Sequence, residues 1–107
     1  MKRVAQVIRV RPEHIEAYVQ VHAEVWPGVL ERLRQQHVTN YSIYRHGDLL
    51  FSYFEYTGDD YEADMAAIAA DPESQRWWKV TDPMQDRVPE ALEGEWWHPI
   101  PEVFHTD

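Results

Sequence analysis

Three side chains on the first expected helix have the types and spacing that acid–base chemistry requires. Tyr18, His22 and Trp26 follow at four-residue intervals, so a helix would stack a phenol, an imidazole and an indole on one face. An imidazole titrates near neutral pH and is the commonest proton-transfer group in enzymes. The alternative is a core stripe whose histidine is hydrogen-bonded to a neighbour. Because Val19 and Val25 already supply apolar packing nearby, we favour a histidine that faces a pocket.

Trp77 and Trp78 form the second group of interest. Adjacent helical residues point about 100° apart, so the two indoles cannot share one helix face. We expect one ring to pack inward while the other walls a cavity. Indoles stack on the C–H faces of sugars, and the methyl group of a 6-deoxy sugar also favours an apolar wall. The alternative is that both tryptophans are core or dimer contacts.

Uncharged polar groups on the second expected strand are further candidates. Strand alternation predicts that Tyr41 faces opposite to Asn40 and Tyr44. An amide and phenols suit sugar hydroxyls, although structural roles for them remain open. Asp82 also draws interest, because it follows the tryptophan pair closely.

Composition excludes several other classes of chemistry. The net charge of −9 disfavours nucleic acid, anionic membranes and phosphorylated ligands, whereas a neutral small molecule suffers no repulsion. There is no cysteine, phosphate-binding glycine loop or nucleophile-elbow motif. His14 and His22 would lie two helical turns apart, about 12 Å, which is too far to chelate one ion. We predict neither a metal nor a cofactor.

The 107 residues have room for one domain, 1–107. The N-terminus leads directly into a strand-like pattern, and no apolar segment approaches the length of a membrane span. The sequence therefore predicts a cytoplasmic protein.

The periodicity of apolar residues predicts the order β-α-β-β-α-β, a ferredoxin-like α+β subunit. The third strand is apolar or aromatic on both faces, while two helical regions can cover only one of them. A second copy is the simplest cover for the other face, so we expect a homodimer. The expected strands are 4–10, 38–44, 49–56 and 103–105. The expected helices begin at 11–13, divide at Pro27-Gly28, and resume at 61–70 and 71–78.

Four motifs in order resemble the L-rhamnose mutarotase family over essentially the whole chain. They are His22-x-x-x-Trp26-Pro27, Asn40-Tyr41-x-Ile43-Tyr44, Gln75-Arg76-Trp77-Trp78-Lys79 and Glu102-Val103-Phe104. The segment Glu95-Trp96-Trp97-His98-Pro99 departs from the family pattern in being more aromatic.

The resemblance implies a dimeric α/β barrel that interconverts the anomers of a neutral 6-deoxy sugar, L-rhamnose, without a cofactor. It implies that His22 is the proton donor and that Tyr18, Tyr41, Trp77 and Trp78 contact the sugar. We assign His22 as donor to the ring oxygen, with Tyr18, Asp82 or a held water as the complementary base. This interpretation requires that His22 and an indole line one cavity just large enough for a pyranose.

Three alternatives remain at this point. The chain could act on another 6-deoxy sugar such as L-fucose. It could be a monooxygenase of the dimeric α+β barrel type, or a sugar-binding dimer without catalysis.

Overall fold

A computed structural model describes all 107 residues as one α+β unit. Its strands are β1 (Lys2–Val10), β2 (Val38–His46), β3 (Leu49–Tyr56), β4 (Gln85–Asp86) and β5 (His98–Pro99). Its α-helices are α1 (Ile15–Val21), α2 (Pro27–Gln35), α3 (Tyr61–Ala69) and α4 (Pro72–Thr81). Short 3₁₀ turns occur at η1 (Pro12–His14), η2 (His22–Glu24) and η3 (Asp82–Met84).

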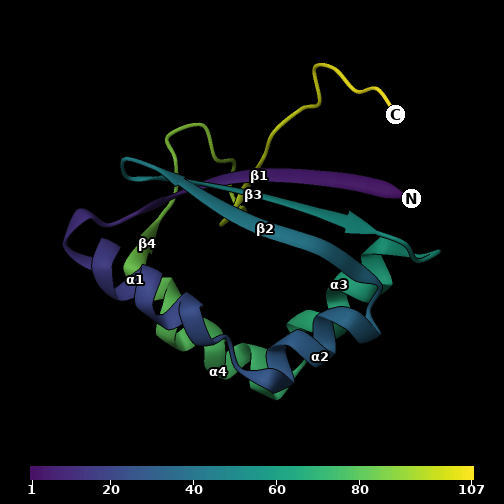
Figure 1. The fold of residues 1–107 in the computed structure, drawn as a ribbon, viewed down its shortest axis with the longest axis horizontal. Helices are drawn as coiled ribbons and strands as arrows, with labels where there is room; N and C mark the ends of the chain where they lie inside the picture. The colour runs from purple at the N-terminus through teal and green to yellow at the C-terminus, as the bar shows by residue number, and fades with distance from the viewer.

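The sheet is antiparallel with the order β2-β3-β1-β4, and β5 also pairs with β1. All the helices lie on one face of the sheet, where they form an arc beneath it, while the C-terminal segment lies on the other face (Figure 1). This is the ferredoxin-like arrangement expected from the order of elements. The curled sheet and the arc of helices enclose the space in which the candidate site lies.

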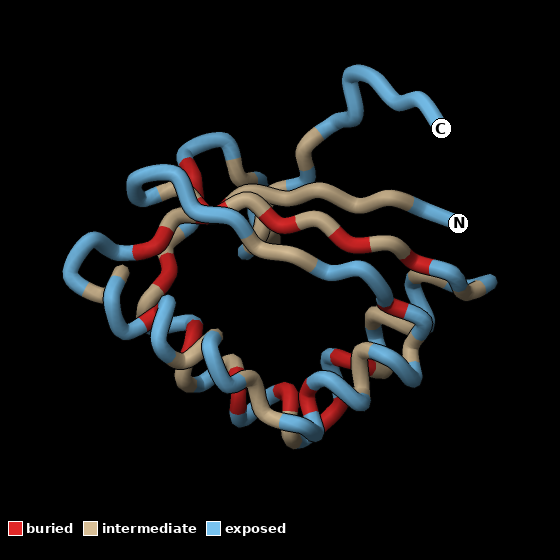
Figure 2. Tube along the Cα trace, in the orientation of Figure 1, coloured by how far each residue is buried: buried red, intermediate tan, exposed pale blue.

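Strand β3 shows why the sheet has an inner and an outer face. Leu50, Ser52, Phe54 and Tyr56 are buried toward the helices, and the residues between them are only half-buried (Figure 2). Two core clusters result. One is built around Ile8, Val10, Tyr18 and Leu50, and the other around Val38, Phe54, Tyr56 and Ile68.

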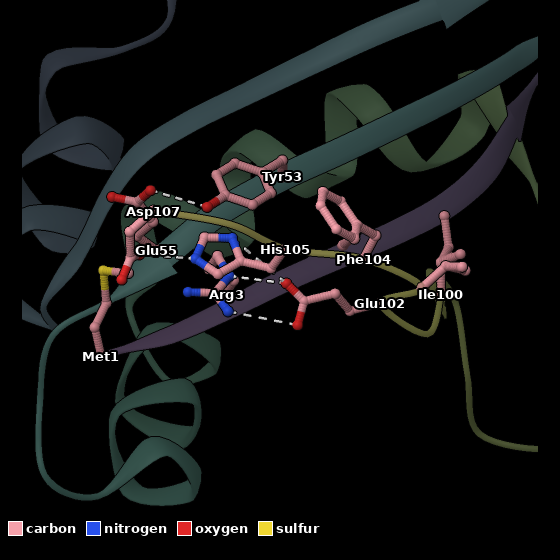
Figure 3. A pocket seen from close by; sticks show the side chains of 11 residues that line it. Met1, Arg3, Tyr53, Glu55, Ile100, Glu102, Phe104, His105 and Asp107 are labelled. Carbon is pink, nitrogen blue, oxygen red and sulfur yellow. Dashed lines mark hydrogen bonds and ion pairs between the residues drawn. The ribbon is translucent and has the colours of Figure 1, made fainter.

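The expected last strand at 103–105 is wrong. Two two-residue strands close the sheet against β1 instead: Gln85–Asp86 pairs with Arg9 and Val10, and His98–Pro99 pairs with Gln6 and Val7. The remaining C-terminal residues cross the outer face of the sheet without regular secondary structure (Figure 3). Arg3 of β1 holds this segment by donating two hydrogen bonds, of 3.0 and 3.4 Å, to the carboxylate of Glu102.

The first helical region divides where the proline predicts. Trp26 is extended (φ −61°, ψ 134°), because a residue before proline is disfavoured in the helical region, and α2 then begins at Pro27. The helix also tightens into the 3₁₀ turn η2 from His22 onward. His22 therefore lies at the end of α1, with the chain turning away behind it.

Helix α4 begins at a cap that also connects it to α2. Asp71 accepts hydrogen bonds from the backbone N–H (2.9 Å) and the hydroxyl (2.8 Å) of Ser74, and Arg32 lies 3.3 Å from its carboxylate. The bonds from Ser74, with a smaller effect of the Arg32 charge, lower the pKa of Asp71. This cap fixes the start of the helix that carries Trp77 and Trp78.

We expect Asp71→Ala to lower the melting temperature at pH 7 by several degrees, and Asp71→Asn, which keeps a cap acceptor, to lower it less. A carboxyl whose pKa is depressed by folding stabilises the protein above its unfolded pKa of about 3.9. That stabilisation is lost as the pH falls through the folded pKa, so wild type and Asp71→Ala should converge in acid. Thermal unfolding followed by circular dichroism checks both points, and an alanine variant that melts like wild type at pH 7 contradicts them.

None of the helices has the length and apolarity that crossing a bilayer requires. The cytoplasmic location stays a prediction.

Candidate functional site

A cavity of about 690 Å³ lies between the inner face of the sheet and the arc of helices. Its size is within the range of about 300–1,000 Å³ that is typical of small-molecule sites. Twenty-two residues line it, sixteen of them hydrophobic, and none of them is a lysine or an arginine. The cavity therefore suits a neutral ligand that presents both apolar and hydroxyl surface.

All five residues predicted to form the site line this one cavity: Tyr18, His22, Tyr41, Trp77 and Trp78. The required juxtaposition of His22 with an indole is present, since the His22 and Trp77 ring centroids lie 5.3 Å apart in an edge-on arrangement. The cavity is roomier than the close fit to a pyranose that we expected. The roles of the five residues in binding and catalysis stay predictions.

One ring nitrogen of His22 is hydrogen-bonded to the backbone, and the other makes no hydrogen bond within the protein. Its Nδ1 lies 2.8 Å from the backbone carbonyl oxygen of Tyr18, and because a carbonyl only accepts, Nδ1 must carry a proton and donate it. Burial lowers the pKa of His22, with the bond to the Tyr18 carbonyl opposing it. The resting ring is thus neutral at pH 7, and Nε2 holds the lone pair that can exchange a proton with a ligand.

The rings on either side fix the plane of the imidazole. The phenol of Tyr18 lies against one face of His22, with ring centroids 4.2 Å apart and planes tilted by 31°. Trp77 meets the imidazole edge-on, and Trp26 meets Trp77 in the same way at 5.2 Å. The predicted helical stripe therefore holds for Tyr18 and His22, whereas Trp26 lies beyond the helix and joins this aromatic group through Trp77.

Both tryptophans of α4 line the cavity, as the family resemblance implied, whereas helix spacing alone had suggested that only one would. Trp77 is 7% exposed and contacts His22, whereas Trp78 is half-buried and packs against the cluster of Val38 and Phe54. The arc of helices wraps around the cavity, so side chains that diverge from one helix can still border the same space.

Tyr41 reaches the cavity because β2 contains a bulge. Asn40 has a positive φ of 47°, and the pairing register with β3 shifts between Thr39 and Ser42. Asn40 instead donates a 3.2 Å hydrogen bond to Glu55, and Tyr44 is exposed, so Tyr41 does face opposite to both. Tyr41 as a whole residue is 42% exposed, yet it lines the cavity, and desolvation by the surrounding protein raises the pKa of its phenol to about 12.

Asp82 is the one carboxylate that lines the cavity. It belongs to η3, directly after the last turn of α4, and no protein hydrogen bond holds its side chain. Partial burial raises its pKa, which makes this carboxylate a better proton acceptor than a solvated one. Tyr18 cannot serve as a resting base, since desolvation raises the pKa of its phenol far above neutrality.

Sequence reasoning missed the polar residues that hold the Tyr18 phenol. Gln85 is 3% exposed, and its Nε2 donates a 3.1 Å hydrogen bond to the Tyr18 hydroxyl oxygen. Trp96 donates from Nε1 to the Gln85 carbonyl oxygen at 2.9 Å. The one available signal was the aromatic excess at 95–99, because Gln85 itself follows η3 without any motif.

A second hollow, of about 740 Å³, lies on the outer face of the sheet. The exposed C-terminal segment forms one wall and β1 and β3 form the other, with the Arg3–Glu102 ion pair between them (Figure 3). It contains no indole, and its histidine, His105, lies on the exposed C-terminal segment and contacts Asp107. We therefore place the functional site in the inner cavity.

Nowhere in the structure do three histidine, aspartate or glutamate side chains converge as metal ligands would.

The state of His22 predicts how activity should vary with pH. As proton donor, His22 must be in its protonated form, so the rate should fall as the pH rises through a His22 pKa that lies below the ordinary value of about 6.5. The phenols of Tyr18 and Tyr41 stay protonated well into the alkaline range, so neither should cause a loss up to about pH 9. Enzyme-dependent turnover, corrected for the solution reaction at each pH, measures this profile. A corrected rate that stays constant or rises between about pH 6.5 and pH 8 would contradict it.

Fold and site together define a small α+β enzyme that brings an imidazole and a carboxylate to an aromatic cavity without lysine or arginine, which suits a neutral ligand. The sequence model of the family named L-rhamnose mutarotase matches residues 3–106. The chain belongs to the L-rhamnose mutarotase family, whose members are carbohydrate isomerases. This membership separates it from the monooxygenases considered as an alternative.

Individual relatives agree with this assignment. The chain is 32% identical over 111 residues to the L-rhamnose mutarotase of Lactiplantibacillus plantarum and 35% identical over 109 residues to that of Opitutus terrae. Both alignments cover 100% of this chain and 100% of the relative.

Solved structures support the fold. The crystal structure of an L-rhamnose mutarotase from Formosa agariphila superposes with a TM-score of 0.79 at 22% identity, covering 100% of both chains. The tetracenomycin F2 cyclase of Streptomyces glaucescens, a polyketide cyclase, superposes with a TM-score of 0.69 at 19% identity, covering 99% of this chain and 96% of the cyclase. The predicted fold class, a ferredoxin-like α+β subunit, is therefore confirmed.

Proposed function

We propose that this chain interconverts the α and β anomers of L-rhamnopyranose by acid–base ring opening. The observation that carries the proposal is His22, whose Nδ1 is tied to the backbone and whose Nε2 is free in a cavity without cations. Family membership and the names of its relatives supply the substrate. The aromatic walls suit the C–H faces and the methyl group of a 6-deoxy sugar.

Anomer exchange requires two proton transfers. The anomeric hydroxyl loses its proton to a base while the C1–O5 bond breaks and the ring oxygen takes up a proton. Rotation about C1–C2 and reclosure by the reverse transfers give the other anomer. Each positioned acid or base contributes about 10²–10⁴-fold. We assign His22 as the proton donor to the ring oxygen. The resting neutral ring first takes a proton from solvent; the imidazolium then gives its Nε2 proton to the ring oxygen, and His22 takes that proton back when the sugar recloses.

The complementary base is either Asp82 or a water molecule held in the cavity. Asp82 lies in the same cavity, and its raised pKa favours proton uptake. Asp82→Asn separates the two options, because the amide cannot accept the anomeric proton but can still hold a water.

Saturation-transfer NMR on L-rhamnose tests the proposed function directly. Irradiation of one anomeric proton should diminish the signal of the other faster with the protein than in buffer. Parallel measurements with L-fucose and D-glucose test the sugar: L-rhamnose should exchange fastest. Exchange at the solution rate despite binding of the sugar would make the protein a sugar-binding module instead.

We also propose that the protein is a homodimer formed through the outer face of the sheet. That face presents the half-buried rings of Phe51 and Tyr53. The C-terminal segment beside it leaves Val103 96% and Phe104 79% exposed. Burying these exposed apolar side chains against a second copy would stabilise the dimer.

Sedimentation-velocity measurements test the assembly. The wild-type protein should sediment at twice the 12.8 kDa mass of one chain, and Phe104→Asp should shift it toward the monomer. A wild type that stays monomeric at high micromolar concentration contradicts the proposal.

A further inference from the structure

We propose that Gln85 and Trp96 are positioning residues that fix the Tyr18 hydroxyl as a hydrogen-bond donor to the ligand. This inference rests on the proposed function, because it assigns the direction of one contact in the same cavity. It concerns a chain of hydrogen bonds that links β4 and the aromatic segment before β5 to the first helix.

The direction of each bond follows from the chemistry of the groups. An indole N–H only donates, so the Gln85 atom 2.9 Å from Trp96 Nε1 must be its carbonyl oxygen. The amide NH₂ of Gln85 is then the group 3.1 Å from the Tyr18 hydroxyl oxygen. The Tyr18 oxygen therefore accepts from Gln85, and its own proton must be donated elsewhere.

The cavity is where that proton can go. Tyr18 lines it, and Gln85 is the one protein group that hydrogen-bonds the phenol oxygen. Burial keeps the phenol protonated, and a buried hydroxyl proton without a partner is unfavourable until a ligand oxygen accepts it. The site thus selects a ligand with an acceptor oxygen at this position.

The same chain of contacts extends to His22. The Tyr18 ring lies against the imidazole at 4.2 Å, and the Tyr18 carbonyl accepts from Nδ1. Trp96 is itself placed by a short anchored segment, in which Glu95 Oε1 accepts from the Leu92 N–H at 2.8 Å and contacts His98 Nδ1 at 2.9 Å. Through Gln85, the aromatic segment 95–99 therefore influences how Tyr18 contacts the ligand.

Two substitutions of nearly equal size separate hydrogen-bond direction from packing. The carboxylate introduced by Gln85→Glu accepts from both Trp96 and Tyr18, so it turns the Tyr18 proton away from the ligand. Gln85→Met fills a similar volume but no longer donates a hydrogen bond to Tyr18. The direction of the Tyr18 O–H is then not fixed by residue 85. Gln20→Glu adds the same charge at an exposed position of α1 outside the cavity and serves as the control.

Anomer exchange measured over a range of L-rhamnose concentrations gives kcat and KM for each variant. At pH 8 we expect kcat/KM to fall about tenfold or more in Gln85→Glu and severalfold in Gln85→Met, mainly through KM, with Gln20→Glu unchanged. Trp96→Phe keeps the aromatic wall but frees the Gln85 amide to rotate, so its KM should rise severalfold.

The pH dependence adds a readout that packing alone would not produce. As the pH falls through the pKa of the new carboxyl, its O–H can donate to Tyr18 in place of the amide, so the Gln85→Glu loss should shrink. The groups that also titrate around this cavity are Tyr18, His22, Tyr41, Tyr61 and Asp82, and the ratio of variant to wild type at each pH removes their effects.

Three outcomes would overturn the inference, provided that wild type catalyses exchange. They are a Gln85→Met loss as large as that of Gln85→Glu at pH 8, a loss in kcat alone, or a Trp96→Phe variant with wild-type KM. A wild type without activity overturns the proposed function instead, so the two failures are distinct. Thermal unfolding of each variant confirms that folded protein is compared.

Discussion

Replacing His22 with alanine should lower enzyme-dependent anomer exchange by about 10²–10⁴-fold while the fold is retained. His22 is the only group lining the cavity whose ordinary pKa lies near neutrality, so no neighbour can take over its proton transfer. Its side chain is half-buried and makes one hydrogen bond, to the backbone of its own helix, so the structural cost of removing it is modest. Saturation-transfer NMR on L-rhamnose measures the loss.

Two matched variants make this result interpretable. His14→Ala removes a half-buried imidazole from η1, outside the cavity, and should leave exchange unchanged. His22→Gln keeps an N–H that can donate near the position of Nδ1 or Nε2 but cannot exchange a proton near neutral pH, so it should be as inactive as alanine. Exchange at the wild-type rate in folded His22→Ala protein would remove this histidine from the mechanism.

Much of the fold could be predicted because long elements carry periodic apolar patterns. The hairpin of β2 and β3 and the division of the first helical region at Pro27 followed from alternation and from proline geometry. The closing strands could not be found in this way. Gln85–Asp86 and His98–Pro99 are too short to show alternation, whereas the apolar pair Val103-Phe104 imitates a strand but lies exposed on the outer face.

The site was predictable to the extent that its residues lie on one helix. Tyr18 and His22 are one helical turn apart, so their contact follows from spacing alone. The bond between Gln85 and Tyr18 joins residues 67 positions apart, and no local pattern specifies such a pair. Tyr41 is an intermediate case. The face of the sheet on which its side chain lies, relative to Asn40 and Tyr44, was predicted. That placement depends on a bulge at Asn40, which simple strand alternation does not include.

Trp77→Ala should produce the largest loss of stability among the site residues. The indole is 7% exposed, and it contacts both His22 and Trp26 edge-on. Deleting a buried tryptophan typically costs about 3–5 kcal/mol, a large part of the stability of a domain of this size. Chemical unfolding at pH 7 measures the change in the free energy of unfolding.

The comparison with Trp78 and with a smaller aromatic ring separates stability from catalysis. Trp78→Ala removes a half-buried ring and should cost less stability. Trp77→Phe keeps an aromatic edge toward His22, so it should restore most of the stability lost in Trp77→Ala and part of the exchange activity. If Trp77→Ala were folded and as active as wild type, the imidazole would be held by Tyr18 alone. The aromatic group around His22 would then be packing rather than part of the site.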